Sequence, residues 1–472
     1  MKIWIAALDA HNNGGITTHI TALTKELTQL GHEVDWITPG GEIVEQLASH
    51  VVKMNQQLFK NYPNNLSVDI IETWALCLEM NFRLKIIEEK PDIIHCHDVI
   101  AYQRLKLIAE SHSLPIVLTV HGHIPDEEVN HGHITENSVE YDYWRKTEWF
   151  ALKELRHIIS VGNELKEYLE NIYPSVQIMN IPNFIHRDFT KIELQNVRSE
   201  LGIDDKTFLI FCPSRYETIK GIDYLLEALV SLPAKAVLLL IDNGTIGLSQ
   251  QIDHKQLQNR VKVIKPVPNT LMSSLYASAD LCVLPSIKIG SKTETSSLSA
   301  MESMIMGTPV LASNVGGLKE VVEGGGKLVP MQDSHALAEE ILRFMTSEEE
   351  LSRYKNLASV RSDSFKAETV VPRLVEVYEA AIHDYEVRFY TPFLLYGFSA
   401  KVLQMIFLTI LNKIEEIKEL LDFSKVRFGI HYRLNLLESY SIIINSLPQN
   451  FEDIKTMGKI LEEELREYIK NR

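Results

Sequence analysis

Short apolar runs alternate with longer amphipathic stretches along most of the chain. The runs are rich in isoleucine, leucine and valine, as in residues 236–241, and this pattern is typical of strands buried on both faces of a parallel sheet. The stretches between them repeat apolar residues at spacings of three and four, which predicts helices that cover a sheet. One such face comprises Ile20, Leu23, Leu27 and Leu30. Because strand and helix alternate, we expect doubly wound α/β domains.

The predicted strands fall into two sets. The first set covers residues 3–8, 34–37, 91–98, 115–122, 156–161 and 178–182, and the second covers residues 208–212, 236–241, 261–264, 281–284, 310–312 and 328–330. A polar stretch from Phe184 to about Asp205 separates them and is expected to be a linker. A chain of 472 residues is also too long for one ordinary domain. We therefore expect one α/β domain over residues 1–188 and a second over 189–369, with a helix at 370–383 that crosses back to complete the first.

The remaining residues, 384–472, have a different pattern and are expected to form a helical extension. Three amphipathic helices are predicted, over about 398–421, 431–446 and 451–470. The last of them carries an apolar stripe at Ile454, Met457, Ile460, Leu461 and Leu465. Such stripes bury one another or a neighbouring surface, as in a small helical bundle. The extension is expected to serve association with a second copy or a protein partner, and an intramolecular brace is the alternative.

One segment of this extension, residues 392–411, is apolar and about long enough to span a bilayer. Lys401 lies near its middle, and the same helical face continues into a charged segment at 413–418. We therefore expect no transmembrane span. The chain opens directly with a strand and shows no signal peptide, which favours a cytoplasmic protein.

Charge and cysteine content narrow the class of protein further. The formal net charge of −16 argues against partners that bind through phosphate charge, both nucleic acid and anionic membrane surfaces. The four cysteines lie apart in apolar segments without metal-type spacing, at positions 77, 96, 212 and 282. They are expected to be reduced thiols of the core.

The segment from Pro285 to Met304 carries the most specific chemistry. Glu294 and Glu302 lie eight residues apart, and Thr293 or Thr295 is a suitable helix cap. A helix that begins there would carry both carboxylates on one face, about two turns apart. Its first backbone amides, at Thr295, Ser296, Ser297 and Leu298, would favour an anion. Two glutamates at this spacing are more often a solvated face, but carboxylates for hydroxyl groups and amides for phosphate together suit a nucleotide-sugar.

Three further groups lie in loops that follow predicted strands. Arg215 and Lys220 are five residues apart and could converge on one diphosphate. Gly14 and Gly15 follow the first strand, where a backbone without side chains can approach a phosphate, although a plain tight turn fits them equally well. His121 ends the strand at 115–122, where side chains point into the ligand crevice of a parallel sheet.

These motifs resemble those of the family 4 retaining glycosyltransferases of the GT-B fold. The glutamate pair with seven residues between resembles the mark of that family, and the segment around Arg215 and Lys220 resembles its GRxxxxKG motif, with Ser214 in place of the glycine. Residues 91–98 resemble its PDxxHxHD element. The family usually has Phe-Gly where this chain has Ser296 and Ser297, which affects the identity of the donor sugar. The resemblance covers about residues 1–383.

The resemblance implies two Rossmann-like domains that face a central cleft and transfer a sugar from a nucleoside diphosphate, with UDP-sugar as the expected donor. Arg215 and Lys220 would neutralise the diphosphate. Glu302 would bind the ribose hydroxyls, Glu294 the sugar hydroxyls, and His121 would contact the sugar near the leaving group. The acceptor would be a hydroxyl of a small molecule, a glycan or a protein, received near the loop at 125–143. No cofactor or metal ligand is implied.

Other interpretations remain open from the sequence. Nucleotide-sugar 2-epimerases share the fold and bind the same kind of donor, and a non-catalytic member would bind a nucleotide-sugar as a scaffold. Six histidines lie close together in sequence and could hold zinc, at positions 95, 97, 121, 123, 131 and 133. Against zinc, the family motifs contain no metal ligand and the chain has no Asp-x-Asp sequence.

Overall fold

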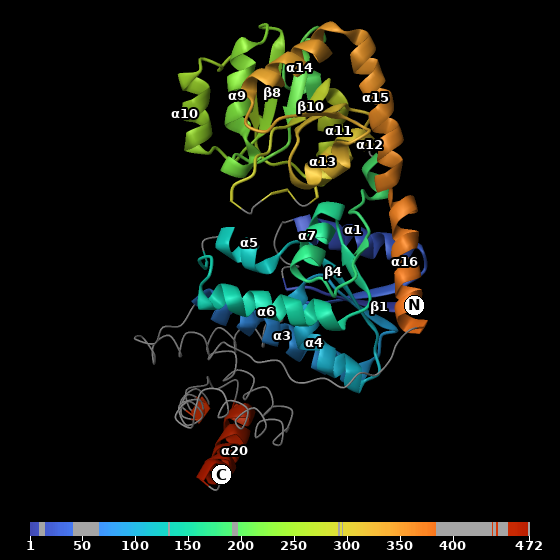
Figure 1. The fold of residues 1–472 in the computed structure, drawn as a ribbon, viewed down its shortest axis with the longest axis vertical. Helices are drawn as coiled ribbons and strands as arrows, with labels where there is room; N and C mark the ends of the chain where they lie inside the picture. Colours follow the sequence, from blue (N-terminus) through green and yellow to red (C-terminus); the bar gives the residue numbers. More distant parts are fainter. Residues whose placement is uncertain are drawn as a thin grey trace.

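The computed structural model describes residues 1–8, 15–40, 66–130, 133–190, 197–290, 293–294, 296–383, 437, 440–441 and 452–470. Two α/β lobes are stacked along the long axis of the molecule, and each contains one six-stranded parallel sheet (Figure 1). The expected fold class, two Rossmann-like domains, is confirmed. The expected linker segment contains a short 3₁₀ turn, η1 (Arg187–Thr190), and the helix α8 (Val197–Glu200).

The sheet of the first lobe has the strand order β2-β1-β3-β4-β5-β6. Its strands are β1 (Lys2–Ala6), β2 (Glu33–Ile37), β3 (Ile93–Cys96), β4 (Ile116–Val120), β5 (Ile158–Ser160) and β6 (Met179–Asn180). The inner strands β3, β4 and β5 consist of buried residues only, which is why they appear in the sequence as uninterrupted apolar runs.

Helices cover both faces of this sheet. They are α1 (Gly15–Gln29), α3 (Leu66–Glu88), α4 (Val99–Ser111), α5 (Ile124–Asn130), α6 (Val139–Glu154) and α7 (Asn163–Ile172). Ile20, Leu23 and Leu27 of α1 are fully buried, as the spacing predicts. Leu30 was expected on the same face, but its side chain is 48% exposed. The helix ends at Gln29, and Gly31 turns the chain away with a φ of 86°.

The sheet of the second lobe has the order β12-β11-β10-β7-β8-β9. Its strands are β7 (Phe208–Cys212), β8 (Ala236–Ile241), β9 (Val261–Ile264), β10 (Leu281–Leu284), β11 (Val310–Ser313) and β12 (Lys327–Val329). When the strands are numbered from one within this lobe and read from the β9 edge, the order is 3-2-1-4-5-6, as in dinucleotide-binding domains. The direction of winding reverses between β7 and β10. Ligands of open α/β sheets bind beyond the carboxyl ends of the strands at such a reversal.

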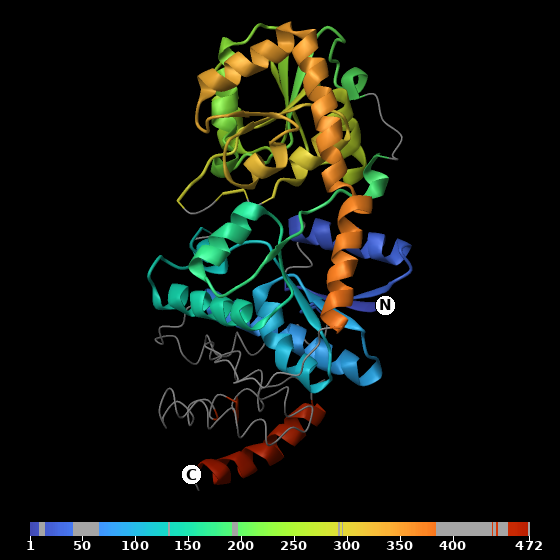
Figure 2. The same cartoon turned by 45° about the vertical axis from the view of Figure 1, so that its right-hand side comes forward.

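The helices of the second lobe surround this sheet. They are α9 (Ile222–Ser231), α10 (Ile246–His254), α11 (Asn269–Ser278), α12 (Leu298–Ile305), α13 (Gly316–Val322), α14 (Ser334–Thr346) and α15 (Glu348–Ser362), with the 3₁₀ turns η2 (Thr218–Lys220) and η3 (Asp363–Phe365). After η3, helix α16 (Ala367–His383) leaves the second lobe and runs down the side of the first (Figure 2). Val370, Leu374 and Tyr378 of α16 pack in one apolar cluster with Ile3 and Ile5 of β1.

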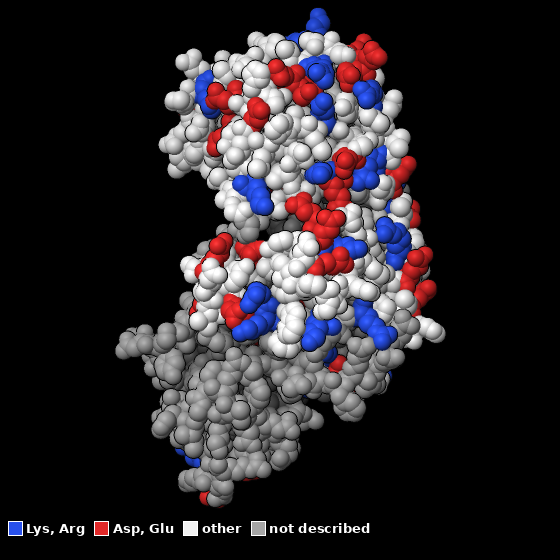
Figure 3. All heavy atoms as spheres, in the orientation of Figure 1, with Lys and Arg blue, Asp and Glu red and all other residues white. Residues whose placement is uncertain are grey.

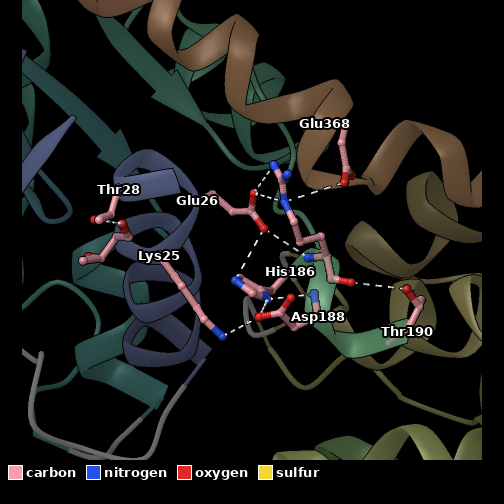
Figure 4. A network of polar contacts seen from close by, with 9 residues as sticks. Lys25, Glu26, Thr28, His186, Asp188, Thr190 and Glu368 are labelled. Carbon is pink, nitrogen blue, oxygen red and sulfur yellow. Dashed lines mark hydrogen bonds and ion pairs between the residues drawn. The ribbon is translucent and has the colours of Figure 1, made fainter. Parts of the chain in front are cut away.

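A polar network fastens the connection between the lobes to α1 (Figure 4). Glu26 is fully buried and accepts hydrogen bonds from the backbone N–H of Arg187 at 3.1 Å and from its Nε at 2.7 Å. Lys25 pairs with Asp188, with 2.7 Å between Nζ and Oδ2. Glu368 of α16 lies 3.7 Å from the same Arg187 Nε. The start of the connection and the crossing helix are thus held together on the first lobe.

Part of the C-terminal extension is described, namely α20 (Glu452–Lys470) and three residues before it. Leu461 and Leu465 are buried, and the Tyr440 hydroxyl lies 3.5 Å from the carbonyl oxygen of Gly458. Ile460 was expected in the apolar stripe of this helix, but its side chain is 70% exposed. Within the described part of the chain, no helix is long and apolar enough to cross a bilayer. Residues 392–411 and the first predicted helix lie outside the described residues.

Candidate active site

Two loops meet where the winding of the second sheet reverses, one after β7 and one after β10. The backbone N–H of Ile287 donates to the carbonyl oxygen of Ile219 at 2.8 Å. Gly221 has a φ of 62°, and a Cβ added there would lie 2.0 Å from the carbonyl oxygen of Pro285. Only glycine allows this close approach without strain. The two loops therefore form one surface, and the residues that each carries lie next to one another.

Lys220 and Glu294 form an ion pair across these loops. The Ser286 hydroxyl also donates to Glu294 Oε1, at 3.3 Å. The side chains of Lys220 and Glu294 are 26% and 16% exposed, so both remain within reach of a ligand. The ammonium group is suited to a diphosphate and the carboxylate to sugar hydroxyls. The structure thus brings together two of the residues that the sequence selected.

The backbone around Glu294 is held by the start of α13. The N–H of Gly317 donates to the Glu294 carbonyl oxygen at 2.5 Å. Gly316 has a φ of 53°, and an added Cβ would lie 2.2 Å from Thr293 Oγ1 and 2.4 Å from the Glu294 carbonyl oxygen. Glu294 is therefore fixed in a loop and is not in the first turn of a helix.

Helix α12 begins later than the sequence indicated. Its N-cap is Ser297, whose hydroxyl accepts a hydrogen bond from the Ala300 N–H at 3.4 Å, and its first helical residue is Leu298. Thr293 is not the cap, and Thr295 lies outside the described residues. The prediction that Glu294 and Glu302 share one helical face is wrong, because only Glu302 is on the helix.

Unsatisfied hydroxyl groups lie beside the start of α12. Thr293 Oγ1 and Ser296 Oγ are buried, and neither has a hydrogen-bond partner among the described residues. Buried polar atoms are nearly always hydrogen-bonded, so an unpaired hydroxyl group marks a place where a ligand or water completes the site. With the free amides of the first helical turn, these hydroxyls suit an anionic group.

Glu302 lies one turn into α12 and accepts a hydrogen bond from the Tyr276 hydroxyl of α11 at 2.8 Å. Burial raises the pKa of Glu302 to about 7, and the hydrogen bond from Tyr276 opposes part of that rise. Both the protonated and the ionised forms of this carboxyl group are therefore populated near neutral pH, so it can donate as well as accept hydrogen bonds. Such a group can hydrogen-bond to a pair of neighbouring hydroxyls, as in a ribose.

Two other predicted residues of the site, Arg215 and Gly15, make no hydrogen bond or ion pair with Lys220 or Glu294 in the part of the chain that the structure describes. The Arg215 side chain is 76% exposed, and its Nε lies 3.4 Å from Glu217 Oε1. It does not join Lys220 in this structure. Gly15 is the first residue of α1, and Gly14 lies outside the described residues.

His121 follows β4 in the first lobe and lies within a cluster of histidines. Its Nε2 is 3.1 Å from Nδ1 of His97, which follows β3. His19 of α1 packs its ring against both, with centroids 5.6 Å from His121 and 5.5 Å from His97. Burial lowers the pKa of His121 to about 3 and that of His19 to about 4, so these rings are neutral at physiological pH. The spacing of histidines in the sequence gave no sign that His19 joins them.

A contact between α7 and α13 joins the two lobes. Asn163, at the start of α7, donates from its side chain to Glu320 Oε1 of α13 at 2.8 Å. Glu320 belongs to the same short helix whose first residues hold Glu294, so this contact links the Glu294 loop to the first lobe. Figure 3 shows the surface deeply hollowed between the two lobes. Among the described residues, the one group of acidic or histidine side chains with ligand atoms close enough for a metal lies elsewhere, at Glu33, Asp35 and Glu89.

A buried charged histidine lies two residues beyond His121. Nδ1 of His123 is 2.9 Å from Asp126 Oδ2, and its Nε2 is 3.1 Å from Glu148 Oε2. Burial alone lowers the pKa of this ring, but the two carboxylates outweigh burial and raise it to about 9. His123 is therefore a cation at neutral pH, unlike the neutral cluster beside it, and it fastens α5 to α6.

We expect the stability conferred by His123 to disappear at alkaline pH. Its pKa is raised from about 6.5 to about 9, so its contribution is complete below pH 6.5 and is lost as the pH rises through 9. A shift of this size corresponds to roughly 3 kcal/mol. The melting temperature of the wild type should therefore fall between pH 6.5 and 9, and that of His123→Gln should start lower and fall less. Parallel curves for the two proteins would contradict this.

Two family models match the lobes in turn. The model described as Glycosyltransferase Family 4 matches residues 13–189, and the model described as Glycosyl transferases group 1 matches residues 194–360. An uncharacterized glycosyltransferase of Methanocaldococcus jannaschii is 29% identical over 66% of this chain and 79% of its own length. The N-acetyl-alpha-D-glucosaminyl L-malate synthase of Bacillus anthracis is 25% identical over 81% of this chain and 98% of its own length.

Solved structures agree on the fold. The sucrose-phosphate synthase of Thermosynechococcus elongatus superposes with a TM-score of 0.64 at 19% identity, over 81% of this chain and 99% of that protein. The Anabaena HepE protein, solved in complex with UDP-glucose, superposes with a TM-score of 0.58 at 18% identity, over 80% of this chain and all of that protein. With one family model matching each lobe and two parallel sheets of this topology, the chain is a glycosyltransferase of the GT-B fold, in which a Glycosyltransferase Family 4 domain is followed by a Glycosyl transferases group 1 domain.

Proposed function

We propose that this protein is a retaining glycosyltransferase that moves a hexosyl group from a nucleoside diphosphate, with UDP-sugar as the donor, to a hydroxyl acceptor. The observation that carries the proposal is the ion pair of Lys220 and Glu294 at the winding reversal of the second sheet. It lies beside buried hydroxyls that lack a partner among the described residues. The cation and the unsatisfied hydroxyls suit the diphosphate of a nucleotide-sugar, and the carboxylate suits its sugar hydroxyls.

In the proposed reaction, the acceptor oxygen attacks the anomeric carbon on the face from which the diphosphate leaves. The bond from that carbon to the diphosphate oxygen breaks, and the proton of the acceptor hydroxyl passes to the leaving phosphate. The protein supplies no covalent nucleophile. Lys220 stabilises the negative charge that grows on the diphosphate, and the first amides of α12 add to this effect. Such preorganised electrostatic stabilisation is usually the largest single contribution to catalysis.

The remaining residues position the donor. Glu294 would hold the sugar hydroxyls, Glu302 the ribose, and His121 the sugar from the opposite wall. Arg215 is exposed and would move onto the diphosphate when the donor binds, with the Gly14–Gly15 loop approaching from the first lobe. Support for UDP comes from the UDP-glucose complex of the HepE neighbour. The name of the N-acetyl-alpha-D-glucosaminyl L-malate synthase relative supports transfer of a sugar to a small hydroxylated acceptor.

A thermal-shift screen against UDP-, GDP- and ADP-sugars tests the donor assignment. A ligand that binds only the folded state raises the melting temperature, by an amount that grows with its concentration. We expect UDP-sugars to give the largest shift and Lys220→Ala to abolish it. Lys255→Ala is the matched control, because Lys255 pairs with Glu227 on the surface of the same lobe. An equal shift in Lys220→Ala and wild type would overturn the site assignment.

Incubation with a labelled donor then separates transfer from the other activities that the fold supports. Free UDP together with a glycosylated acceptor is the expected result. An epimerised nucleotide-sugar would show a 2-epimerase instead, and an unchanged donor in the presence of every acceptor would show a binding scaffold.

We expect activity to survive chelation of divalent metals. The diphosphate has a protein cation in Lys220, and the carboxylate and hydroxyl groups around it are already committed to the sugar and the phosphate. Turnover measured with and without EDTA should agree within about twofold, since no step of the proposed reaction needs a metal-bound oxygen. Loss of activity on chelation, restored by one particular metal, would contradict the expectation and direct attention to the histidine cluster.

We propose that the extension at 384–472 serves association with a second copy of the chain or with a protein partner. Its described part carries a buried face at Leu461 and Leu465. Removal of 384–472 should lower the molar mass found by light scattering from that of an oligomer to that of one chain. An unchanged oligomeric state would contradict self-association through this extension.

The four cysteines are all free and buried, which fits the reducing cytoplasm that we propose as the location.

A further inference from the structure

The histidine cluster contains one direct hydrogen bond between two rings. Nδ1 of His97 and Nε2 of His121 are 3.1 Å apart, and their rings are stacked with an interplanar angle of 22°. His97 is 1% exposed, whereas His121 is half-buried at the end of β4. The proposed function gives His121 a role beside the sugar. It leaves the buried ring behind it, His97, without one.

His97 is held from several sides. Its backbone N–H donates to the Ala6 carbonyl oxygen at 2.9 Å, at the end of β1. The ring of His95 lies 4.1 Å away between centroids, and is itself fixed by the Tyr378 hydroxyl at 2.7 Å and the Thr119 hydroxyl at 2.8 Å. Contacts from β1, β4 and α16 thus hold His95 and His97, which lie at the end of β3. His97 therefore has little freedom to turn away from His121.

The number of protons on the His97 and His121 rings allows only two arrangements of their hydrogen bond. Burial lowers the pKa of His97 well below its usual value and that of His121 to about 3, and protonation of a neighbouring ring would oppose a charge on His97 further. Both rings are therefore neutral, and each carries one proton. Either His97 donates from Nδ1 to His121, or His121 donates from Nε2 to His97.

The far side of His97 distinguishes the two arrangements. Its Nε2 is buried and has no hydrogen-bond partner among the described residues. If His121 were the donor, this Nε2 would carry a proton, and a buried N–H group would be left without an acceptor. If His97 is the donor, only a lone pair is left unsatisfied. Unpaired buried N–H groups are rarer than unpaired acceptors, so the second arrangement is favoured.

We propose that His97 is a positioning residue that donates from Nδ1 to Nε2 of His121 and so fixes His121 as the tautomer with its proton on Nδ1. His121 then carries its N–H group on Nδ1, the ring nitrogen that does not contact His97, and accepts from His97 at Nε2. It acts on the sugar as a hydrogen-bond donor to an oxygen atom and has no free lone pair with which to serve as a general base. This assignment of a role at the sugar rests on the proposed function, but the tautomer itself does not.

Nitrogen NMR of the full-length protein with ¹⁵N-labelled histidine rings tests the tautomer directly, because protonated and bare ring nitrogens differ widely in chemical shift. The His121 signals are assigned by their loss in His121→Gln. We expect Nδ1 of His121 to be of the protonated type and Nε2 to be of the bare, hydrogen-bonded type between pH 6 and 8. A proton on Nε2 of His121 in the wild type would overturn the proposal without need of any further variant.

Two variants of His97 test its role. His97→Asn keeps an N–H donor at the δ position, so the His121 tautomer should be retained. His97→Phe removes the donor, and we expect the proton of His121 to move to Nε2. His335→Phe serves as the control, because this ring is 82% exposed on α14. An unchanged His121 spectrum in His97→Phe would overturn the proposal, and so would a changed tautomer in His97→Asn.

Kinetics supply the second measurement. With the donor found in the screen, His97→Phe should lose about tenfold to a hundredfold in kcat, the range found when the hydrogen-bond partner of a metal-bound histidine is removed. Its KM should change less, and His97→Asn should recover most of the rate. If the protein transfers no sugar at all, the proposed function fails while the NMR result stands. If transfer occurs but His121 has the other tautomer, the inference alone fails.

Discussion

Lys220→Ala is expected to lower kcat by about two to three orders of magnitude, the loss typical when one preorganised charge-stabilising group is removed. Lys220 is the cation that the structure places at the winding reversal of the second sheet, paired with Glu294. Because its side chain lies at the end of a loop and not in the core, we expect the variant to fold normally. Glu294→Ala should abolish transfer, since it removes the carboxylate that we propose binds the sugar hydroxyls.

The control for this experiment is Lys255→Ala, which breaks a lysine–glutamate pair of the same kind between α10 and α9. Circular dichroism and thermal melting establish that all three variants are folded before turnover is compared. If Lys220→Ala or Glu294→Ala keeps near-normal turnover with the donor found in the screen, the site assignment is wrong.

Gly316→Ala is expected to damage both the fold around the site and its activity. The residue has a φ of 53°, and the new Cβ would lie 2.2 Å from Thr293 Oγ1 and 2.4 Å from the Glu294 carbonyl oxygen. Backbone strain and steric overlap of this kind together cost roughly 2–4 kcal/mol. Relief of the overlap requires the Glu294 loop to move, so transfer should fall to the level of Glu294→Ala.

Gly307→Ala is the matched control for this prediction. Gly307 also has a positive φ, of 78°, but a Cβ added there meets no heavy atom within 4 Å. Its substitution should cost only the backbone preference, about 1 kcal/mol, with turnover close to that of the wild type. Chemical denaturation and donor turnover are measured for both variants. Equal activity in the two variants would show that the contact between Gly316 and the Glu294 loop does not hold Glu294 in the position that the proposed reaction needs.

The strands of both sheets could be predicted because buried parallel strands are uninterrupted apolar runs. The boundaries of β7, β8, β9 and β10 agree with the runs at 208–212, 236–241, 261–264 and 281–284. Loops that follow such strands are also predictable, and Lys220 and Glu294 lie in two of them. Their meeting depends on strand order, which the sequence pattern does not contain.

The start of α12 could not be predicted, because several residues in a row are good caps. Thr293, Thr295 and Ser297 all have suitable side chains, and only Ser297 is the N-cap. Gly316 and Gly317, which are more than twenty residues further along the chain, contact the Glu294 backbone and hold it in a loop. The helix therefore starts after Glu294. Local sequence therefore placed Glu294 on the wrong element.

His19 was missed for a related reason. It lies on the buried face of α1 beside Ile20 and Leu23, where a single histidine carries no recognisable spacing. It joins His97 and His121 only when α1 packs against the carboxyl ends of β3 and β4. A site made from three separate elements becomes visible only in the folded chain.

The most direct test of retaining transfer follows the anomeric carbon of the sugar by NMR. The full-length protein is incubated with a ¹³C-labelled UDP-sugar chosen by the thermal-shift screen and with a pool of hydroxylated acceptors, and Lys220→Ala is run in parallel. We expect UDP and a new glycoside in equal amounts, with the anomeric configuration of the donor preserved, and product formation about two to three orders of magnitude slower in the variant. A product of inverted configuration, a donor epimerised at C2, or equal turnover by Lys220→Ala would contradict the account.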